Sequence, residues 1–457
     1  MTQALTGAGP GPLLSEERSA RLMGGMTGKI ETALAIARST GAPVLAAAAA
    51  ELAGEVDPVA VIAGARRAGE QWFCLEQPQR DGFALATVGT ARALEARGPE
   101  RFGAVAAQWR ELAAAAVCDR DLAGPVGSGL VAVGGFAFAD NGGEGPDWDG
   151  FTPASMTVPD LAIARHRGRA QLTVAVTVAP DDDADELVSC VAARLAGLRS
   201  EPLPLLDPAP VGRYRVQSPM PPSHYEDAVA RAVGRIRAGE LEKIVLAREV
   251  RVHAPDDHDP AAIIGMLRDA FPSCYVFAVG RGDATFVAAS PELLVRRDGQ
   301  RASTVALAGS TRRSADPAVD DHLGERLLRS DKDREENQIV MRRIARALGP
   351  HSVWVTAAPE PVVVKVANIQ HLATPIRAQL AEPIDAIELA GLLHPTPAVG
   401  GEPLHVAAGL IPALEGLDRG WYAGAVGYCD QSGDGEFCVA LRCALLRGPV
   451  AQLFAGC

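Results

Sequence analysis

The sequence has little that would suit a membrane, a secreted scaffold or a nucleic-acid partner. No apolar run approaches the length of a membrane-spanning helix, and the first residues, Met-Thr-Gln-Ala-Leu-Thr-Gly, lack the basic and apolar stretches of a signal peptide. Lys and Arg number 44 against 56 Asp and Glu, and the net charge of −12 disfavours nucleic-acid binding, which needs clustered cations. We expect a cytoplasmic protein that binds neither membranes nor nucleic acid.

Several motifs that carry familiar chemistry are also missing. The eight cysteines include no Cys-x-x-Cys pair, so neither a zinc site nor a redox dithiol is indicated. There is no P-loop, no His-Glu-x-x-His and no Gly-x-Ser-x-Gly motif, and the glycines at positions 7, 9 and 11 follow no strand, as a dinucleotide fingerprint would require. Function must therefore be sought in other patterns.

The 457 residues divide into parts of different character. Residues 1–20 are rich in Gly and Pro and are expected to form a loose tail, whereas residues 21–215 alternate helical and β-like stretches. The acidic run 181–186 is interpreted as a solvated turn that leads into a helix. A Pro-rich linker at 201–210 precedes residues 216–457, which hold the denser motifs.

Secondary-structure signals indicate a mixture of strands and helices. A capping box at Ser223-His-Tyr-Glu226 predicts a helix start, and a long helix is predicted from about Asp321 to Leu348. Strands are predicted at 129–138, 171–178, 243–252, 274–279, 284–289, 292–297, 301–307, 421–429, 436–446 and 450–455. Gly-containing turns between them predict mainly antiparallel sheets with helices outside.

Some charged residues could carry chemistry, although each also has a structural interpretation. Lys243 opens an otherwise apolar strand and Glu292 begins another; taken singly, each is better explained by a structural ion pair. Asp333 and Glu336 are three residues apart on a helix and share a face, as a metal-binding or acid pair would. Composition alone favours surface salt bridges there, such as Lys332 with Glu336.

The two histidines His371 and His394 lie beside apolar residues, and a satisfied core histidine is the favoured interpretation of each taken singly. Their neighbourhoods are more informative. In chain order, the conspicuous pieces are Lys243-Ile-Val-Leu-Ala-Arg248, Ser290-Pro-Glu-Leu-Leu294, Leu307-Ala-Gly-Ser-Thr-Arg-Arg313, Lys332-Asp-Arg-Glu-Glu336, Gln370-His-Leu-Ala-Thr374, Leu393-His-Pro-Thr-Pro-Ala-Val-Gly400, Gly424-Ala-Val-Gly427 and Leu441-Arg-Cys443. From about Ser218 to Gly456 the chain thereby resembles the chorismate-utilising enzymes, which include isochorismate, salicylate and anthranilate synthases.

The resemblance implies a fold and a reaction. The fold would be one large α/β (α+β) body of antiparallel sheets in a sandwich-like arrangement with helices outside, in which 21–215 adds elements to the shared sheets and 216–457 is the catalytic core. A lysine at Lys243 is similar to the members that use water as the nucleophile, which implies an isochorismate synthase, an isomerase acting on chorismate. Lys243 would take a proton from the attacking water, which requires a neutral amine. Glu292 would protonate the departing C4 hydroxyl, which requires a raised pKa.

The resemblance also implies binding roles. Glu336 matches the glutamate that holds Mg²⁺, and the metal would bridge to the ring carboxylate of chorismate. Arg442 and Tyr422 match residues that hold the enolpyruvyl carboxylate, for which the arginine fork is suited. The other expected substrate contacts are Ala308, Gly309, Ser310, His371, Ala398 and Gly456.

Two alternatives stay open at this point. Salicylate synthases, which go on to eliminate pyruvate, usually carry Thr where this chain has Ala398, so Ala398 resembles the members that stop at isochorismate. The resemblance further implies a second glycine and a helix with another metal-binding glutamate after Gly456, whereas the sequence ends at Cys457. A core without that helix could be a catalytically silent relative. The pathway that takes the product, whether menaquinone, siderophore or salicylate, stays open, and a monomer is expected.

Overall fold

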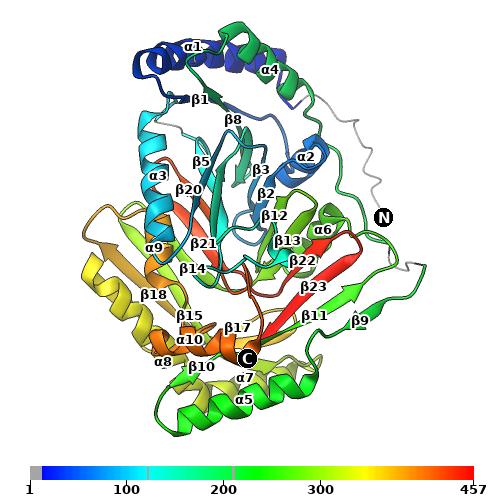
Figure 1. Ribbon diagram of the computed structural model, residues 1–457, viewed down its shortest axis with the longest axis vertical. Coiled ribbons are helices and arrows are strands. Elements are labelled where there is room, and N and C mark those ends of the chain that lie inside the picture. Colours follow the sequence, from blue (N-terminus) through cyan, green and yellow to red (C-terminus); the bar gives the residue numbers. More distant parts are fainter. Residues whose placement is uncertain (1–12, 121–122, 208–210, 457) are drawn as a thin grey trace.

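Two large antiparallel sheets form the body of the computed structural model, which describes residues 13–120, 123–207 and 211–456 (Figure 1). In spatial order, the eleven-stranded sheet contains β1 (Val44–Glu51), β8 (Arg169–Val178), β7 (Leu161–His166), β3 (Phe83–Val88), β2 (Trp72–Gln77), β12 (Tyr275–Arg281), β13 (Ala284–Ser290), β22 (Cys443–Arg447), β23 (Val450–Gly456), β11 (Ala247–His253) and β9 (Arg215–Gln217). The ten-stranded sheet contains β16 (Ser352–Ala357), β18 (Ile369–Leu380), β15 (Arg301–Arg312), β14 (Leu293–Asp298), β21 (Gly435–Val439), β20 (Ala425–Asp430), β5 (Val131–Phe136), β6 (Ala154–Val158) and β4 (Arg92–Ala96), with β17 (Val362–Lys365) paired to β18. A small sheet joins β10 (Lys243–Ile244) to β19 (Gly401–Glu402). Both large sheets thus draw strands from both halves of the chain.

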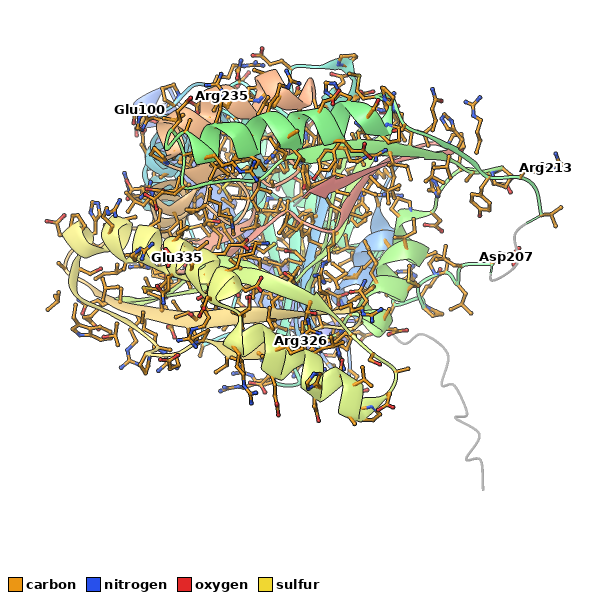
Figure 2. All side chains as sticks on the ribbon, turned by 90° about the horizontal axis from the view of Figure 1, so that it is seen from below. Glu100, Asp207, Arg213, Arg235, Arg326 and Glu335 are labelled. Carbon is orange, nitrogen blue, oxygen red and sulfur yellow. The ribbon has the colours of Figure 1, made fainter. Side chains whose placement is uncertain are left out.

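Helices cover the outside of the sheets. They are α1 (Glu16–Thr40), α2 (Pro58–Ala65), α3 (Arg101–Ala115), α4 (Ala184–Ala196), α5 (Pro222–Arg237), α6 (Pro260–Ala270), α7 (Pro317–Arg329), α8 (Asp331–Leu348), α9 (Ala386–Leu393) and α10 (Leu404–Glu415), with short 3₁₀ turns at Pro146–Trp148 and Gly349–His351. Helices α5, α7 and α8 all lie at the lower end of the molecule in Figure 1; seen from that end in Figure 2, α5, which carries Arg235, lies on the opposite side from α7 and α8, which carry Arg326 and Glu335. Within the described ranges, no helix combines the length and apolar character that crossing a bilayer needs.

The central strands of the eleven-stranded sheet are buried on both faces, which explains why they are apolar almost throughout, whereas the edge strand β9 is exposed. In β2, Phe73 and Leu75 belong to the core shared with the ten-stranded sheet. The alternate residues Trp72 and Cys74 belong to a second core that includes residues of α1 and α2. Side chains alternate between the faces of a strand, so both sets must be apolar. The sandwich-like fold class implied by the sequence is confirmed.

The beginning of the described chain corrects one expectation. Helix α1 begins at Glu16, so residues 16–20 are helical and the loose tail predicted over 1–20 is wrong for them. The Ser15 side chain accepts a hydrogen bond from the Arg18 backbone N–H, and acidic residues follow in the first turn, as favoured at a helix start. Residues 1–12 lie outside the described part.

Of two helix starts predicted later in the chain, one is confirmed and one is wrong. The acidic run 181–186 leads into α4 as predicted, because the Asp183 side chain accepts hydrogen bonds from two backbone N–H groups of its first turn. The capping box predicted at Ser223 is wrong, since α5 begins at Pro222 and its N-cap is Pro221. Proline suits the first helical position, where its missing N–H would have no partner in any case.

Two predicted strands are each divided in the structure. The strand predicted over 243–252 is β10 and β11, which belong to different sheets. Between them the carbonyl oxygens of Val245 and Leu246 accept hydrogen bonds from the Arg419 and Tyr225 side chains. The strand predicted over 436–446 is likewise divided into β21 and β22. Each division lies next to a residue of the expected site.

The long helix predicted over 321–348 is two helices, α7 and α8, that meet at Ser330. Ser330 ends α7, and its hydroxyl accepts a hydrogen bond from the Asp333 backbone N–H, which starts α8. The interruption allows α8, with Asp333 and Glu336 in its first turns, to run in its own direction along β15 and β18.

Candidate active site

Lys243 and Glu336, two of the expected site residues, form an ion pair. Lys243 Nζ donates to Glu336 Oε1 at 2.7 Å, and the two side chains are 10% and 31% exposed. The pair joins β10 to α8, so the alternative in which Glu336 pairs with Lys332 is wrong for the described chain. The Glu336 side chain therefore points toward Lys243 rather than along α8.

Glu292 is buried close to this pair. Its residue is 4% exposed, and its backbone carbonyl accepts a hydrogen bond from Val439 N at 3.0 Å. Burial raises the pKa of Glu292 from 4.5 to about 8, while the charge of Lys243 and then the hydroxyl of Thr396 act in the opposite direction. The carboxyl group is thus mostly protonated at neutral pH and can give up a proton. Lys243, Glu292 and Glu336 are called the acid–base cluster below.

A second cluster joins Ser310, His371 and Arg442, called the anchor cluster below. Arg442 Nη2 lies 2.8 Å from His371 Nε2, and Ser310 Oγ lies 2.8 Å from His371 Nδ1. Because arginine is always protonated, Nε2 accepts and the Nδ1–H donates to the hydroxyl. Burial, with the charge of Arg442, lowers the pKa of His371 to about 4, so the ring is neutral.

The position of Arg442 depends on a special backbone conformation. Its φ is +50°, in the left-handed region that residues other than glycine seldom adopt. This conformation falls in the break between β21 and β22. Arg442 Nη1 is buried and has no hydrogen-bond partner among the described residues. One arm of the guanidinium is therefore held by His371 while the other is available for a carboxylate.

Tyr422 and Gly456 lie together beside β11. Gly456 pairs with Ala247, and a Cβ at Gly456 would lie 2.8 Å from Tyr422 Oη and 2.9 Å from Leu246 O. Only glycine fits there. Burial raises the pKa of Tyr422, so its hydroxyl stays protonated and can donate.

The small residues expected around the substrate lie in two segments. Ala308 and Gly309 are buried in a bulge between β15 and β18, and Gly309 has a φ of +81°. Ala398 is half-buried in the segment that follows α9. The end of this segment reaches the strand of Lys243, because Gly400 O accepts a hydrogen bond from Val245 N at 2.8 Å.

The donor set suits a magnesium ion that keeps much of its water. Among the described residues, no group of three or more His, Cys, Asp or Glu side chains could enclose a metal. Mg²⁺, however, usually retains several waters and binds through one or two carboxylates together with substrate oxygens. Glu336, whose side chain is 31% exposed, fits a ligand of that kind.

His394 lies outside both clusters. Its Nε2 is 3.0 Å from the Phe138 carbonyl oxygen, and burial followed by the charge of Arg101 lowers its pKa to about 3. The interpretation of this residue as a satisfied core histidine is confirmed. Its hydrogen bond joins the start of the segment 394–400 to Phe138, at the end of the segment that follows β5.

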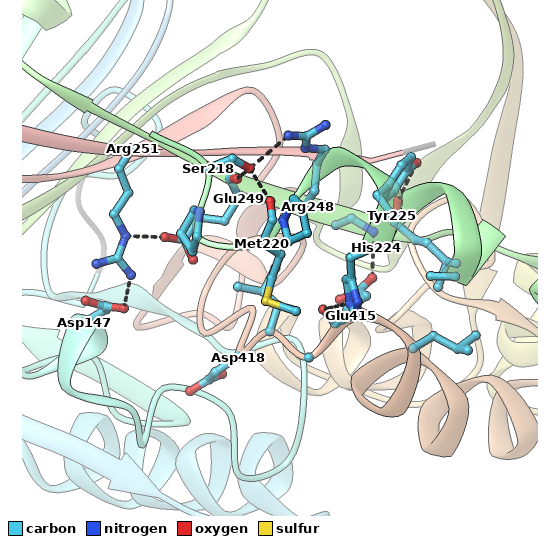
Figure 3. A pocket seen from close by; sticks show the side chains of 18 of the residues that line it. Asp147, Ser218, Met220, His224, Tyr225, Arg248, Glu249, Arg251, Glu415 and Asp418 are labelled. Atoms are coloured by element: carbon cyan, nitrogen blue, oxygen red, sulfur yellow. Dashed lines mark hydrogen bonds and ion pairs between the residues drawn. The ribbon is translucent and has the colours of Figure 1, made fainter. Parts of the chain in front are cut away.

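Two cavities of the described chain are lined by residues other than the reactive groups. A cavity of about 250 Å³ lies beside β11 and the start of α5, with Met220, His224, Glu249 and Asp418 in its wall (Figure 3). A larger one, of about 760 Å³, is lined in part by His394. Neither lining includes a member of the acid–base cluster or the anchor cluster.

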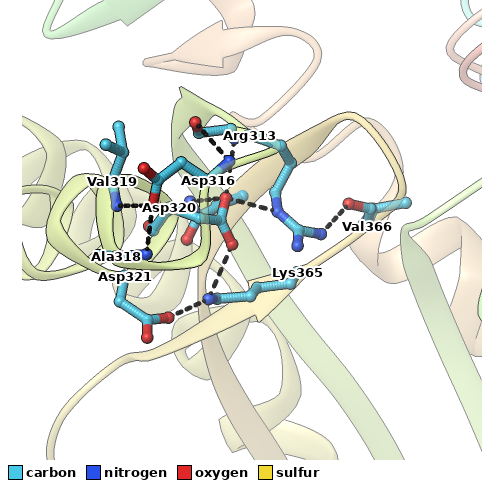
Figure 4. Close-up of polar contacts among 10 residues, drawn as sticks. Arg313, Asp316, Ala318, Val319, Asp320, Asp321, Lys365 and Val366 are labelled. Carbon is cyan, nitrogen blue, oxygen red and sulfur yellow. Dashed lines mark hydrogen bonds and ion pairs between the residues drawn. The ribbon is translucent and has the colours of Figure 1, made fainter.

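Arg313, at the end of the 307–313 motif, serves the fold instead. Its Nε donates to Asp320 Oδ1 at 2.8 Å, and Lys365 Nζ donates to Asp320 Oδ2 at 2.9 Å (Figure 4). Gln370 Nε2 completes the set at 3.0 Å. Arg313 and then Lys365 hold the pKa of Asp320 well below its ordinary value. This network fastens α7 to β15, β17 and β18.

Sequence reasoning assigned no role to two polar residues that the structure brings to the site. Thr396 lies near Glu292, and Asn337 is buried between α8 and the sheet. For Asn337 a signal was present, because Val340 and Ile344 follow it at three and seven residues and so share its helix face. Both of these apolar residues are buried.

The sequence and fold of this chain are similar to those of known enzymes. Residues 31–457 match the family described as "Chorismate binding enzyme". This chain belongs to the chorismate-binding enzyme family. It is 36% identical to the salicylate biosynthesis isochorismate synthase of Pseudomonas aeruginosa over 94% of this chain and 88% of the relative. It is 32% identical to the isochorismate synthase MenF of Bacillus subtilis over 79% of this chain and 76% of the relative. Among solved structures, the menaquinone-specific isochorismate synthase MenF of Escherichia coli matches with a TM-score of 0.75 and 26% identity over 94% of both chains.

Proposed function

We propose that this chorismate-binding enzyme is an isochorismate synthase, an isomerase that adds a hydroxyl at C2 of chorismate and removes the one at C4. The observation that carries the proposal is the acid–base cluster, in which a buried carboxyl group with a pKa of about 8 lies close to the Lys243 amine. Water addition and hydroxyl loss need a base and an acid together. Relatives named isochorismate synthase support the same reaction.

In the proposed reaction Lys243 takes a proton from the water that attacks C2. The contact with Glu336 fixes where the Lys243 amine lies. Glu292 gives its proton to the C4 hydroxyl, which leaves as water with the electrons of the C4–O bond, while the ring double bonds shift from C2 toward C4. One water is consumed and one released, so substrate and product are isomers.

Binding of the two substrate carboxylates is proposed to be divided between the ends of the site. The free Nη1 of Arg442, with the Tyr422 hydroxyl beside Gly456, would hold the enolpyruvyl carboxylate. Glu336 would hold Mg²⁺, which when bound supplies positive charge to the ring carboxylate. Ala308, Gly309 and Ala398 leave space for the ring.

The setting of the enzyme is also part of the proposal. We place it in the cytoplasm, a location that the free cysteines support, since five of the seven described ones are buried thiols: Cys74, Cys274, Cys429, Cys438 and Cys443. We also propose that the enzyme is a monomer.

The proposal is tested by incubating the protein with chorismate, with and without Mg²⁺, and separating the products by chromatography. Isochorismate should form with Mg²⁺ and should fall on chelation. Release of pyruvate with salicylate would identify a salicylate synthase instead. No consumption of chorismate under either condition would contradict the assignment.

A further inference from the structure

Asn337 is a buried polar residue that the proposed chemistry does not use. Its residue is 2% exposed. Its Nδ2 lies 3.0 Å from Ala306 O, 3.2 Å from Leu372 O and 3.4 Å from Ala308 O, and its Oδ1 accepts from Thr374 Oγ1 at 2.6 Å. Both the donor and the acceptor of the amide are therefore satisfied, by β15 and β18.

These hydrogen bonds surround an irregularity in the pairing of β15 with β18. Leu307 pairs with Ala373, but the next pair is Ser310 with His371, so two residues of β15 face one residue of β18. A bulge of this kind bends the strand and re-aims the side chains beyond it. The first pair beyond the bulge is Ser310 with His371, which are two members of the anchor cluster.

The same amide fixes the helix that carries Glu336. Asn337 directly follows Glu336 on α8, and α8 packs on β15 and β18. Gly309, at a φ of +81°, allows the close approach, since a Cβ there would lie 3.0 Å from Asp333 Cβ. Asn337 thus connects the helix of the acid–base cluster to the bulge that presents the anchor cluster.

We infer that Asn337 is a positioning residue that keeps the acid–base cluster in register with the anchor cluster. This inference rests on the proposed function, because the substrate must contact both clusters at once. A displacement of about 1 Å between groups that must act together can cost on the order of 10²-fold in rate. A buried amide with one acceptor bond and three carbonyls in reach resists such a displacement in several directions.

The test compares Asn337→Ala with a matched control, Thr304→Val. Thr304 lies on β15, a strand that Asn337 contacts, and is 2% exposed; it donates to Leu294 O at 2.7 Å, and no hydrogen bond among the described residues joins its side chain to either cluster. Both variants should melt at lower temperature than the wild type. Asn337→Ala should lose roughly 10²-fold in kcat/KM, mostly in kcat, whereas Thr304→Val should stay within about twofold. Thr374→Val, which removes one of the amide's hydrogen bonds, should lie between them.

A second readout does not need turnover. Nitrogen-15 NMR should show His371 in the wild type with a protonated Nδ1 and an unprotonated Nε2, the signals being assigned with His371→Gln. In Asn337→Ala this single tautomer should give way to an exchanging mixture, whereas Thr304→Val should keep it.

The possible failures can be distinguished. The inference would be overturned if Asn337→Ala had the same kcat/KM as Thr304→Val and an unchanged His371 spectrum. If the wild type and Thr304→Val also leave chorismate untouched, the proposed function fails, and the His371 spectrum alone decides the role of Asn337. If Asn337→Ala does not fold, Thr374→Val decides by the same two measurements.

Discussion

Replacing Glu292 with Gln should abolish turnover and stabilise the fold at neutral pH. Gln has nearly the shape of the protonated acid but cannot give up a proton in the reaction. Loss of a general acid lowers kcat by about 10² to 10⁴-fold. The stabilisation follows from burial, which raises the pKa of Glu292 from 4.5 to about 8.

The difference in the pKa of Glu292 between the folded and unfolded chains makes the stability depend on pH. The folded state favours the protonated carboxyl, so between pH 4.5 and 8 the unfolded state binds fewer protons and the stability of the wild type falls as pH rises. With about 1.4 kcal/mol per pKa unit, the loss is about 1 kcal/mol at pH 5 and about 3 kcal/mol at pH 7. Gln does not titrate, so the advantage of the variant should grow by about 2 kcal/mol over this interval.

Urea unfolding at pH 5 and pH 7, with chorismate turnover in parallel, measures both effects. Glu76→Gln is the activity control, because Glu76 is 1% exposed and burial raises its pKa to about 7, yet its neighbours are Arg165 and Arg268, outside the site. This control should retain turnover. An advantage of Glu292→Gln that is equal at both pH values, or turnover like that of the wild type, would refute the assignment of a protonated acid.

Three further substitutions test other members of the site. Lys243→Ala should lower kcat by about 10² to 10⁴-fold without loss of the folded state by circular dichroism, and an active variant would exclude Lys243 as the base. Arg442→Lys should raise the KM for chorismate by about 10 to 100-fold, because lysine cannot hold His371 and a carboxylate with one planar fork; an unchanged KM would place the enolpyruvyl carboxylate elsewhere. Ala398→Thr adds a hydroxyl near the ring and should release some pyruvate with salicylate, and chromatography that shows isochorismate alone would remove Ala398 as the basis of product choice.

The sequence predicted the fold class, and its motifs predicted which residues would lie close together. The motif pieces around Lys243, Glu292 and Glu336 come from three separate stretches, and the structure places all three in one cluster. The partner of Glu336 could not be read from spacing, since Lys332 is its neighbour in sequence and Lys243 its neighbour in space.

The errors fall where tertiary contacts override a local pattern. The apolar run after Lys243 is continuous, yet Arg419 and Tyr225 take the carbonyl oxygens that would have extended the strand. The break at Ser330 was hidden because a serine inside a helical pattern can be either an interior residue or a cap. Arg442 was predicted to lie within a strand, and nothing in its own type predicts a φ of +50°.

The order of the strands in the eleven-stranded sheet has a consequence for how the molecule is made. In the eleven-stranded sheet, β22 and β23 lie between β13 and β11, so that Ala288 pairs with Cys443 and Ala247 with Gly456. During synthesis β11 and β13 emerge long before the strands that separate them. Until then each presents an unpaired edge, which can recruit strands of other chains. Closing such distant pairs is slow, so a nascent chain should depend on protection of these edges until β23 has left the ribosome.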